Sequence, residues 1–122
     1  MSTNKRETKG TKRATEYLDR VLCDAVESGA DTVELERVPE GLEICFLAGG
    51  SGMGIVLEDR KLEAELIGLI VRRAGIRDRP TGKMNWKIEG ENRTIAVEEY
   101  DSFGESCFRL KLDRPRRRPR RQ

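Results

Sequence analysis

Apolar and polar residues alternate along three stretches in the second half of the chain, 83–89, 93–100 and 106–112. In the first stretch Met84, Trp86 and Ile88 share one parity, and polar residues hold the other. Because successive side chains of a strand point to opposite faces, each stretch predicts a strand with one buried and one exposed face. Residues typical of turns separate the stretches at 90–92 and at 101–104. The pattern therefore predicts a three-stranded antiparallel meander.

The chain before these strands contains two stretches with helical rather than alternating spacing. Apolar residues recur every three or four positions over 14–28 and again over 60–74, which predicts two amphipathic helices. Gly29 and Gly75 stand where each helix needs a C-terminal cap, and Asp59 stands where the second helix needs an N-terminal cap. Each helix has one apolar stripe, so both are expected to cover a sheet.

Further strands are predicted between the two helices. Residues 30–37 alternate, a turn follows at 39–41, and 42–48 alternate again. In the second of these strands Cys45 and Leu47 make the outward parity less polar than usual. Such a strand is either a central strand of the sheet or part of a surface that meets a partner, and we favour the central strand.

The order of these elements predicts an α+β fold, with two helices packed on one face of a mostly antiparallel sheet of five to six strands. A single domain is expected over 14–112, because 122 residues leave room for one core. Residues 1–13 lack periodicity and are expected to form a disordered basic tail. Residues 113–122 form a second basic tail, rich in Arg and Pro.

A glycine-rich segment at 49–54 invites comparison with the loops that bind nucleotide phosphates. A loop of the Walker A type ends in Gly-Lys-Ser/Thr and opens a helix. Here no lysine follows, and the segment runs into Ile55, Val56 and Leu57, which are typical of a strand. We therefore predict a flexible hairpin turn rather than a nucleotide site.

Composition restricts the class of protein further. No run of about 18 apolar residues exists, and the N-terminus lacks the apolar segment of a secretory signal, so neither a membrane span nor export is expected. Cys23, Cys45 and Cys107 are an odd number of thiols without metal-ligand spacing, and the chain has no histidine. We expect a cytoplasmic protein with reduced thiols, no bound metal and no cofactor. Because a cysteine nucleophile would lack its usual histidine base, no enzymatic activity is expected.

The net charge of +2 conceals a strong asymmetry along the chain. Residues 1–15 carry +4 and residues 113–122 carry +5, which leaves −7 on the 97 residues between them. The C-terminal tail holds the candidate anion-binding residues, Arg114, Arg116, Arg117, Arg118, Arg120 and Arg121. Two prolines favour an extended tail, whose guanidinium groups suit nucleic-acid phosphate, an anionic membrane surface or an acidic protein. A tail that only keeps the protein in solution is the other interpretation.

Several segments resemble one protein family. Residues 29–36 (GADTVELE) are similar to the GASDIHIE opening of the domain that precedes the motor in type II secretion and type IV pilus ATPases. Residues 79–83 (RPTGK) resemble the family's RRPQDGR, and the hairpin at residues 93–112 resembles its RVSTLPT…GEKVVLRLL. The resemblance covers roughly residues 16–112. It implies a PAS-like fold, which agrees with the order of elements predicted from the pattern.

The parts that make the family's motors catalytic are missing from this chain. It contains no Walker lysine, no Mg²⁺-binding motif and no histidine, so the resemblance implies no ATP hydrolysis by the chain alone. The family's aspartate and histidine positions fall on Thr32 and Glu34, and its arginine-bearing strand falls on residues 43–49, which contain no arginine. The candidates that the resemblance places near phosphate are Arg79, Gly82 and Lys83, with Arg77 nearby. The other interpretation of these four residues is a turn with solvated charges.

These observations predict a non-catalytic protein-interaction or regulatory module. Its partner would be a secretion- or pilus-type ATPase, or a second copy of the chain. The alternative is a small protein that binds nucleic acid or an anionic membrane surface non-specifically through its basic tails. About six phosphate contacts would make such binding fall steeply with salt, with a log–log slope of about −4 to −5, and deletion of residues 113–122 should abolish it.

Overall fold

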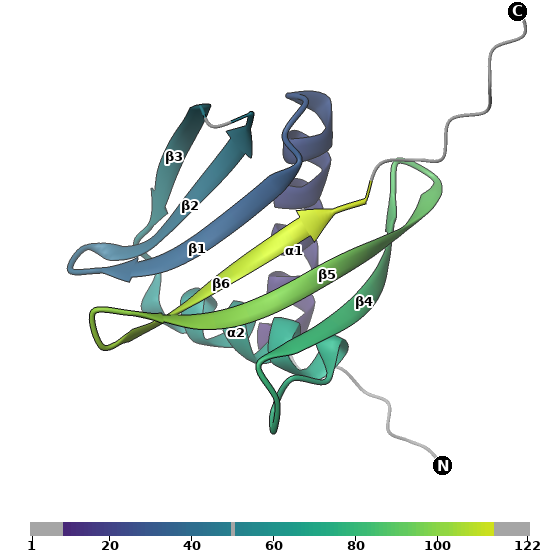
Figure 1. Ribbon diagram of the computed structural model, residues 1–122. Helices are drawn as coiled ribbons and strands as arrows, with labels where there is room; N and C mark the ends of the chain where they lie inside the picture. Colours follow the sequence, from purple (N-terminus) through teal and green to yellow (C-terminus); the bar gives the residue numbers. More distant parts are fainter. Residues whose placement is uncertain (1–8, 50, 114–122) are drawn as a thin grey trace, which may run out of the picture.

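The computed structural model of the protein describes residues 9–49 and 51–113. These residues form two helices and six strands (Figure 1). In chain order the elements are α1 (Lys9–Glu27), β1 (Thr32–Val38), β2 (Gly41–Ala48), β3 (Ser51–Leu57), α2 (Arg60–Ala74), β4 (Thr81–Ile88), β5 (Glu91–Ser102) and β6 (Glu105–Leu112). The predicted order of elements and the α+β class are confirmed. Within the described residues, neither helix is long and apolar enough to cross a membrane.

All six strands belong to one antiparallel sheet with the order β3-β2-β1-β6-β5-β4. Each half of the chain contributes a three-stranded meander, and the two meanders join where β1 pairs with β6, with Val33 opposite Leu110. Both helices pack on the same face of the sheet and against each other (Figure 1). We call the opposite face of the sheet the open face. β3 and β4 are the two edges, and β2 is an internal strand, as expected.

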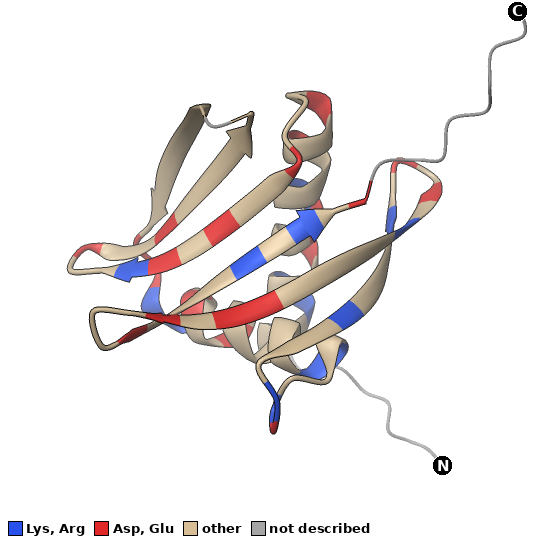
Figure 2. Cartoon of the chain, viewed as in Figure 1, with Lys and Arg blue, Asp and Glu red and all other residues tan. Residues whose placement is uncertain are grey.

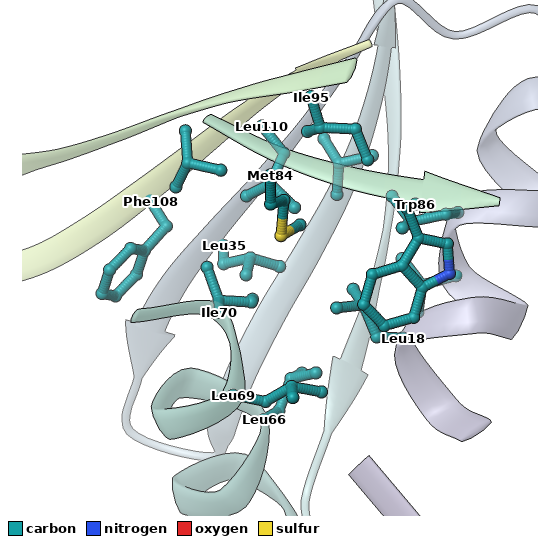
Figure 3. Packing of buried hydrophobic residues seen from close by; sticks show 14 of the residues in the cluster. Leu18, Leu35, Leu66, Leu69, Ile70, Met84, Trp86, Ile95, Phe108 and Leu110 are labelled. Carbon is teal, nitrogen blue, oxygen red and sulfur yellow. The ribbon is translucent and has the colours of Figure 1, made fainter. Parts of the chain in front are cut away.

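The core lies between the two helices and the inward parity of the strands (Figure 3). The residues predicted to point inward from the last three strands are all buried: Met84, Trp86, Ile88, Ile95, Val97, Phe108, Leu110 and Leu112. From the helices, Leu18, Leu66 and Ile70 reach the same cluster. Burial of one such side chain stabilises the fold by about 1.5–3 kcal/mol. The apolar parity of each strand therefore fixes which face of the sheet is inside.

Trp86, the single tryptophan of the chain, ties the edge strand β4 to both helices. Its indole Nε1 donates a hydrogen bond to Asp19 Oδ1 on α1 at 3.0 Å. The Arg73 guanidinium on α2 lies 4.6 Å above the centre of the ring. A buried indole N–H needs an acceptor, and Asp19 supplies one.

The predicted helix caps are confirmed. At the start of α2 the Asp59 carboxylate accepts a hydrogen bond from the Leu62 amide at 3.0 Å. Gly75 ends α2 in the left-handed conformation, with φ of 67°, and Gly29 follows α1 with φ of 80°. Glycine adopts this backbone without the steric cost that a side chain would add.

The start of α1 corrects the sequence prediction. Apolar spacing places the beginning of this helix at residue 14, but α1 begins at Lys9. Arg13 Nη2 forms an ion pair with Asp59 Oδ2 at 2.8 Å, and Thr15 Oγ1 donates to the Thr11 carbonyl at 2.9 Å. Because these contacts are polar, a pattern of apolar residues does not reveal them. The interpretation of residues 9–13 as disordered is wrong, and the rest of that predicted tail, residues 1–8, lies outside the described part of the chain.

The hairpin turns of the second meander are tighter than the sequence suggested. β4 pairs as far as Ile88 and β5 begins to pair at Glu91, so the turn consists of Glu89 and Gly90. Both residues have positive φ, 53° and 81°. The prediction of a turn at 90–92 is wrong because a two-residue hairpin turn of this type needs positive φ at both of its positions, which leaves the next residue in the strand.

Candidate functional site

The open face of the sheet carries rows of opposite charge (Figure 2). Acidic positions on β1 and β5 flank basic positions on β6. Arg109 of β6 lies at the centre of this arrangement. Its Nε lies 2.9 Å from Glu34 Oε2, its Nη1 lies 3.1 Å from Glu98 Oε1, and its guanidinium lies 4.5 Å above the centre of the Tyr100 ring. The hydrogen bond to Glu34 raises the pKa of Arg109 above its ordinary value. Two carboxylates thus neutralise Arg109, which makes it a poor group for capturing an anion.

The four residues carried over from the family resemblance fall into two separate hollows. Arg77 and Arg79 are exposed in the loop before β4, beside a hollow of about 360 Å³ that they share with three acidic side chains. Gly82 and Lys83 lie on β4 and line another hollow of about 300 Å³ on the open face, next to Arg109. The structure therefore does not bring the four residues together around one anion.

Gly82 has a packing role that requires no ligand. β4 passes the end of α2 so closely that a Cβ at this position would overlap the carbonyl oxygen of Ala74 and lie 2.8 Å from Ile76 Cγ2. Only glycine fits this approach without moving one of the two elements. Its match to the family pattern is explained by the contact between sheet and helix.

The three thiols are free, and burial raises the pKa of each of them. Cys107 has the outward parity that the sequence predicted, yet it is fully buried. It lies opposite Tyr100 on β5 and Glu36 on β1, which share its face of the sheet. A raised pKa reduces the thiolate fraction at neutral pH, so all three are weak nucleophiles.

Glu63, at the first turn of α2, is the buried charged residue of the described part of the chain, with 6% of its surface exposed. Its Oε2 accepts from Arg37 Nε at 3.2 Å, which joins α2 to β1. Its Oε1 has no hydrogen-bond partner among the described residues and is closed off from solvent. A ligand could not reach this oxygen without opening the fold, so the pair is part of the architecture rather than a binding site.

The edge strand β3 is the strongest candidate for an interaction surface. Its apolar side chains are exposed, Met53 by 61%, Ile55 by 50% and Val56 by 43%. No charged residue occurs from 51 to 57, whereas the other edge strand, β4, carries two lysines. Natural sheets protect their edges with charges, prolines or bulges, and β3 has none of these in its regular register with β2.

The backbone groups that β3 leaves unpaired can be assigned. Along an antiparallel strand, successive residues alternate between bonding one neighbouring strand and the other. The Leu47 carbonyl accepts from the Asp31 amide at 2.9 Å, on the side of β1, so Leu47 and the Gly52 opposite it do not bond each other. Gly52, Gly54 and Val56 therefore point their N–H and C=O groups outward. We call these outward groups, together with the side chains of the strand, the β3 edge.

Two glycines of this segment, Gly52 and Gly54, are explained by side-chain packing rather than by phosphate binding. β3 begins at Ser51, so Gly52 and Gly54 lie within a strand that pairs with β2. A Cβ at Gly52 would lie 2.6 Å from Leu47 Cδ2, and a Cβ at Gly54 would lie 3.2 Å from Cys45 Sγ. The absent side chains let those of β2 lie over the edge strand. The interpretation of the whole glycine-rich segment as a flexible turn is wrong.

The alternation of apolar and polar residues does not reveal this edge, although the sequence contains another signal for it. Residues 44–57 are fourteen consecutive uncharged residues in a chain that is 38% charged. Met53 and Ile55 lie opposite Phe46 and Ile44, on the face of the sheet that the helices cover. Ile44 is buried there, Phe46 is half-buried, and the β3 side chains beyond them are exposed. The apolar surface of the core thus continues past the helices to the rim of the sheet.

The remaining candidate residues belong to the C-terminal tail. The six tail arginines at 114–121 lie outside the described residues. In the part of the chain that the structure describes, no cluster of Cys, Asp and Glu could hold a metal ion.

No protein-family model matches this chain, and no curated protein matches it.

Proposed function

We propose that the folded body is a non-catalytic protein-interaction or regulatory module, related to the domain that precedes the motor in type II secretion and type IV pilus ATPases, and that it works in the cytoplasm. The observation that carries this proposal is the uncharged and exposed β3 edge. The resemblance of residues 16–112 to that domain suggests the class of protein with which the module acts.

An unprotected edge strand favours strand addition. Its outward N–H and C=O groups supply a row of hydrogen bonds, and alternate side chains supply specificity. Met53 and Ile55 add apolar area on one face of the strand, where removal from water contributes about 25 cal/mol per Å². Exposed apolar side chains next to free backbone groups are features of a surface that another strand covers.

The chemistry of the open face supports a binding role rather than a catalytic one. Arg109 is neutralised by Glu34 and Glu98, and burial raises the pKa of Cys45 and Cys107, the two thiols with outward parity in the sheet. A nucleophilic thiol needs the opposite shift.

The proposal is tested by adding the purified full chain to a purified secretion- or pilus-type ATPase from the same cell and measuring ATP turnover and assembly size. The wild-type chain is expected to change one or both. Ile55→Lys places a charge on the β3 edge and should weaken the effect at least tenfold. Phe103→Lys is the matched control, because Phe103 is fully exposed in the turn between β5 and β6, away from β3. If the wild-type chain changes neither turnover nor assembly, the proposal loses its support.

A further inference from the structure

We infer that the β3 edge binds the β3 edge of a second copy of this chain, antiparallel and in the register that places Gly54 opposite Gly54. The two six-stranded sheets would then form one continuous sheet of twelve strands. This inference deepens the proposed function, since it rests on the β3 edge being a protein-binding surface and names what covers it.

The backbone of β3 is self-complementary in this register. In an antiparallel pair related by a two-fold axis, the numbers of any two opposite residues have the same sum. When Gly54 lies opposite the Gly54 of the other copy, Gly52 therefore lies opposite Val56. These three are the residues whose N–H and C=O groups point outward. Centring the pair on Gly54 therefore matches every outward group of one copy with an outward group of the other. A shift by one residue would place outward groups opposite inward ones.

The side chains agree with the same register. Met53 of each copy falls opposite Ile55 of the other, on the face of the sheet that carries the helices. Side chains at such pairs between the hydrogen-bonded positions approach most closely. Two Met–Ile pairs would cover the apolar rim at which the core now ends, and the glycines on the other face leave the two backbones free to approach.

The distribution of charge favours a second copy over a charged partner. Residues 51–57 contain no charge, so two identical edges can meet without repulsion along the strand. Lys83 and Lys87 of β4 would oppose such pairing at the other edge of the sheet. One like-charge contact remains, because Glu43 Oε2 lies 3.3 Å from where a Cβ of Gly54 would be, close to the two-fold axis. The dimer should therefore tighten as salt rises, and Glu43→Gln should tighten it about threefold.

Sedimentation equilibrium of the full chain tests the inference. The wild-type chain is expected to be a dimer that dissociates on dilution. Met53→Glu and Ile55→Lys should each weaken the dimer at least tenfold, because each buries a charge against an apolar side chain of the other copy. The double variant carrying both changes should recover most of the affinity, since the register places the new carboxylate opposite the new ammonium group. Phe103→Lys should leave the dimer unchanged.

Hydrogen exchange supplies a second measurement that needs no variant. At concentrations where the dimer forms, the amides of Gly52, Gly54 and Val56 should become protected, while those of Met53 and Ile55 are protected at all concentrations because they bond β2. A wild-type chain that stays monomeric, a dimer that Ile55→Lys leaves intact, or outward amides that exchange freely in the dimer would each overturn the inference. A monomeric chain that still alters ATPase turnover would leave the proposed function standing, and a dimer without effect on the ATPase would remove only the proposed function.

Discussion

Replacing Gly82 with alanine adds one methyl group at the point where β4 passes the end of α2. The methyl would overlap the Ala74 carbonyl oxygen and lie 2.8 Å from Ile76 Cγ2. Because the first of these neighbours is backbone, it cannot turn aside as a side chain would, so the strand and the helix must separate. Extra carbon atoms forced into a packed site cost about 1–3 kcal/mol.

The expected size of the effect follows from two opposing terms. Because the added methyl group meets the rigid backbone of Ala74, we expect a steric cost of about 3 kcal/mol, the upper end of the range for overpacking. Alanine also reduces the freedom of the unfolded chain, which offsets about 0.4–1 kcal/mol. Gly82→Ala should therefore lower the free energy of unfolding by about 2 kcal/mol. For a domain of about 100 residues this corresponds to a decrease in Tm of about 10 °C.

Urea denaturation followed by Trp86 fluorescence measures this change, and Gly68→Ala is the matched control. Gly68 lies inside α2, where the nearest atom to an added Cβ is Arg72 Nη1 at 3.9 Å. The same chemical change should stabilise the protein there by about 0.5–1 kcal/mol, because alanine is the better helix former. If Gly82→Ala were neutral or stabilising, the close approach of β4 to α2 would be wrong.

Three further predictions concern single side chains. Arg37→Ala leaves the buried Glu63 carboxylate without its partner, so it should destabilise the protein by about 1–2 kcal/mol in urea denaturation; the loss is smaller than for a fully buried pair because Arg37 is 41% exposed. Glu63→Met removes the buried charge and should be neutral or stabilising. Equal losses of stability in both variants would contradict a desolvated Glu63 carboxylate. Cys107 should react with iodoacetamide only after unfolding, as read by mass spectrometry, and rapid labelling of the native protein at pH 7 would refute its burial. The hydrogen bond from the Leu62 amide lowers the pKa of Asp59 below its ordinary value of about 3.8. Asp59 therefore contributes stability that is present above its unfolded pKa and is lost as pH falls through its folded pKa, so in thermal melts below pH 4 the Asp59→Ala variant should lose less Tm than the wild-type chain.

Local pattern was sufficient to predict most of the elements of this protein. α2 spans residues 60–74 as predicted, because an apolar stripe, the Asp59 cap and the Gly75 cap all lie within the same stretch of chain. The strands match to within a few residues for the same reason, since alternation is a property of neighbouring side chains. The inward parity of β4, β5 and β6 follows directly from this alternation.

Tertiary structure alone decided the features that depend on residues far apart in the sequence. The pairing of β1 with β6 joins the two halves of the chain, and no local pattern specifies which strands meet. α1 begins at Lys9, and its first turns include Arg13, which forms an ion pair with Asp59, the N-cap residue of α2. Cys107 is buried despite its outward parity because Glu36 and Tyr100 lie opposite it on the neighbouring strands.

The candidate site shows the same division. The sequence by itself determined that residues 44–57 are uncharged, and it predicted a strand at residues 55–57, which are the last three residues of β3. Only the order of strands made β3 an edge, left Met53 and Ile55 beyond the helices, and turned the backbone groups of three residues outward. The physical reason is that exposure of a strand depends on which other elements cover it, and covering is settled by packing of the whole chain rather than by the strand's own residues.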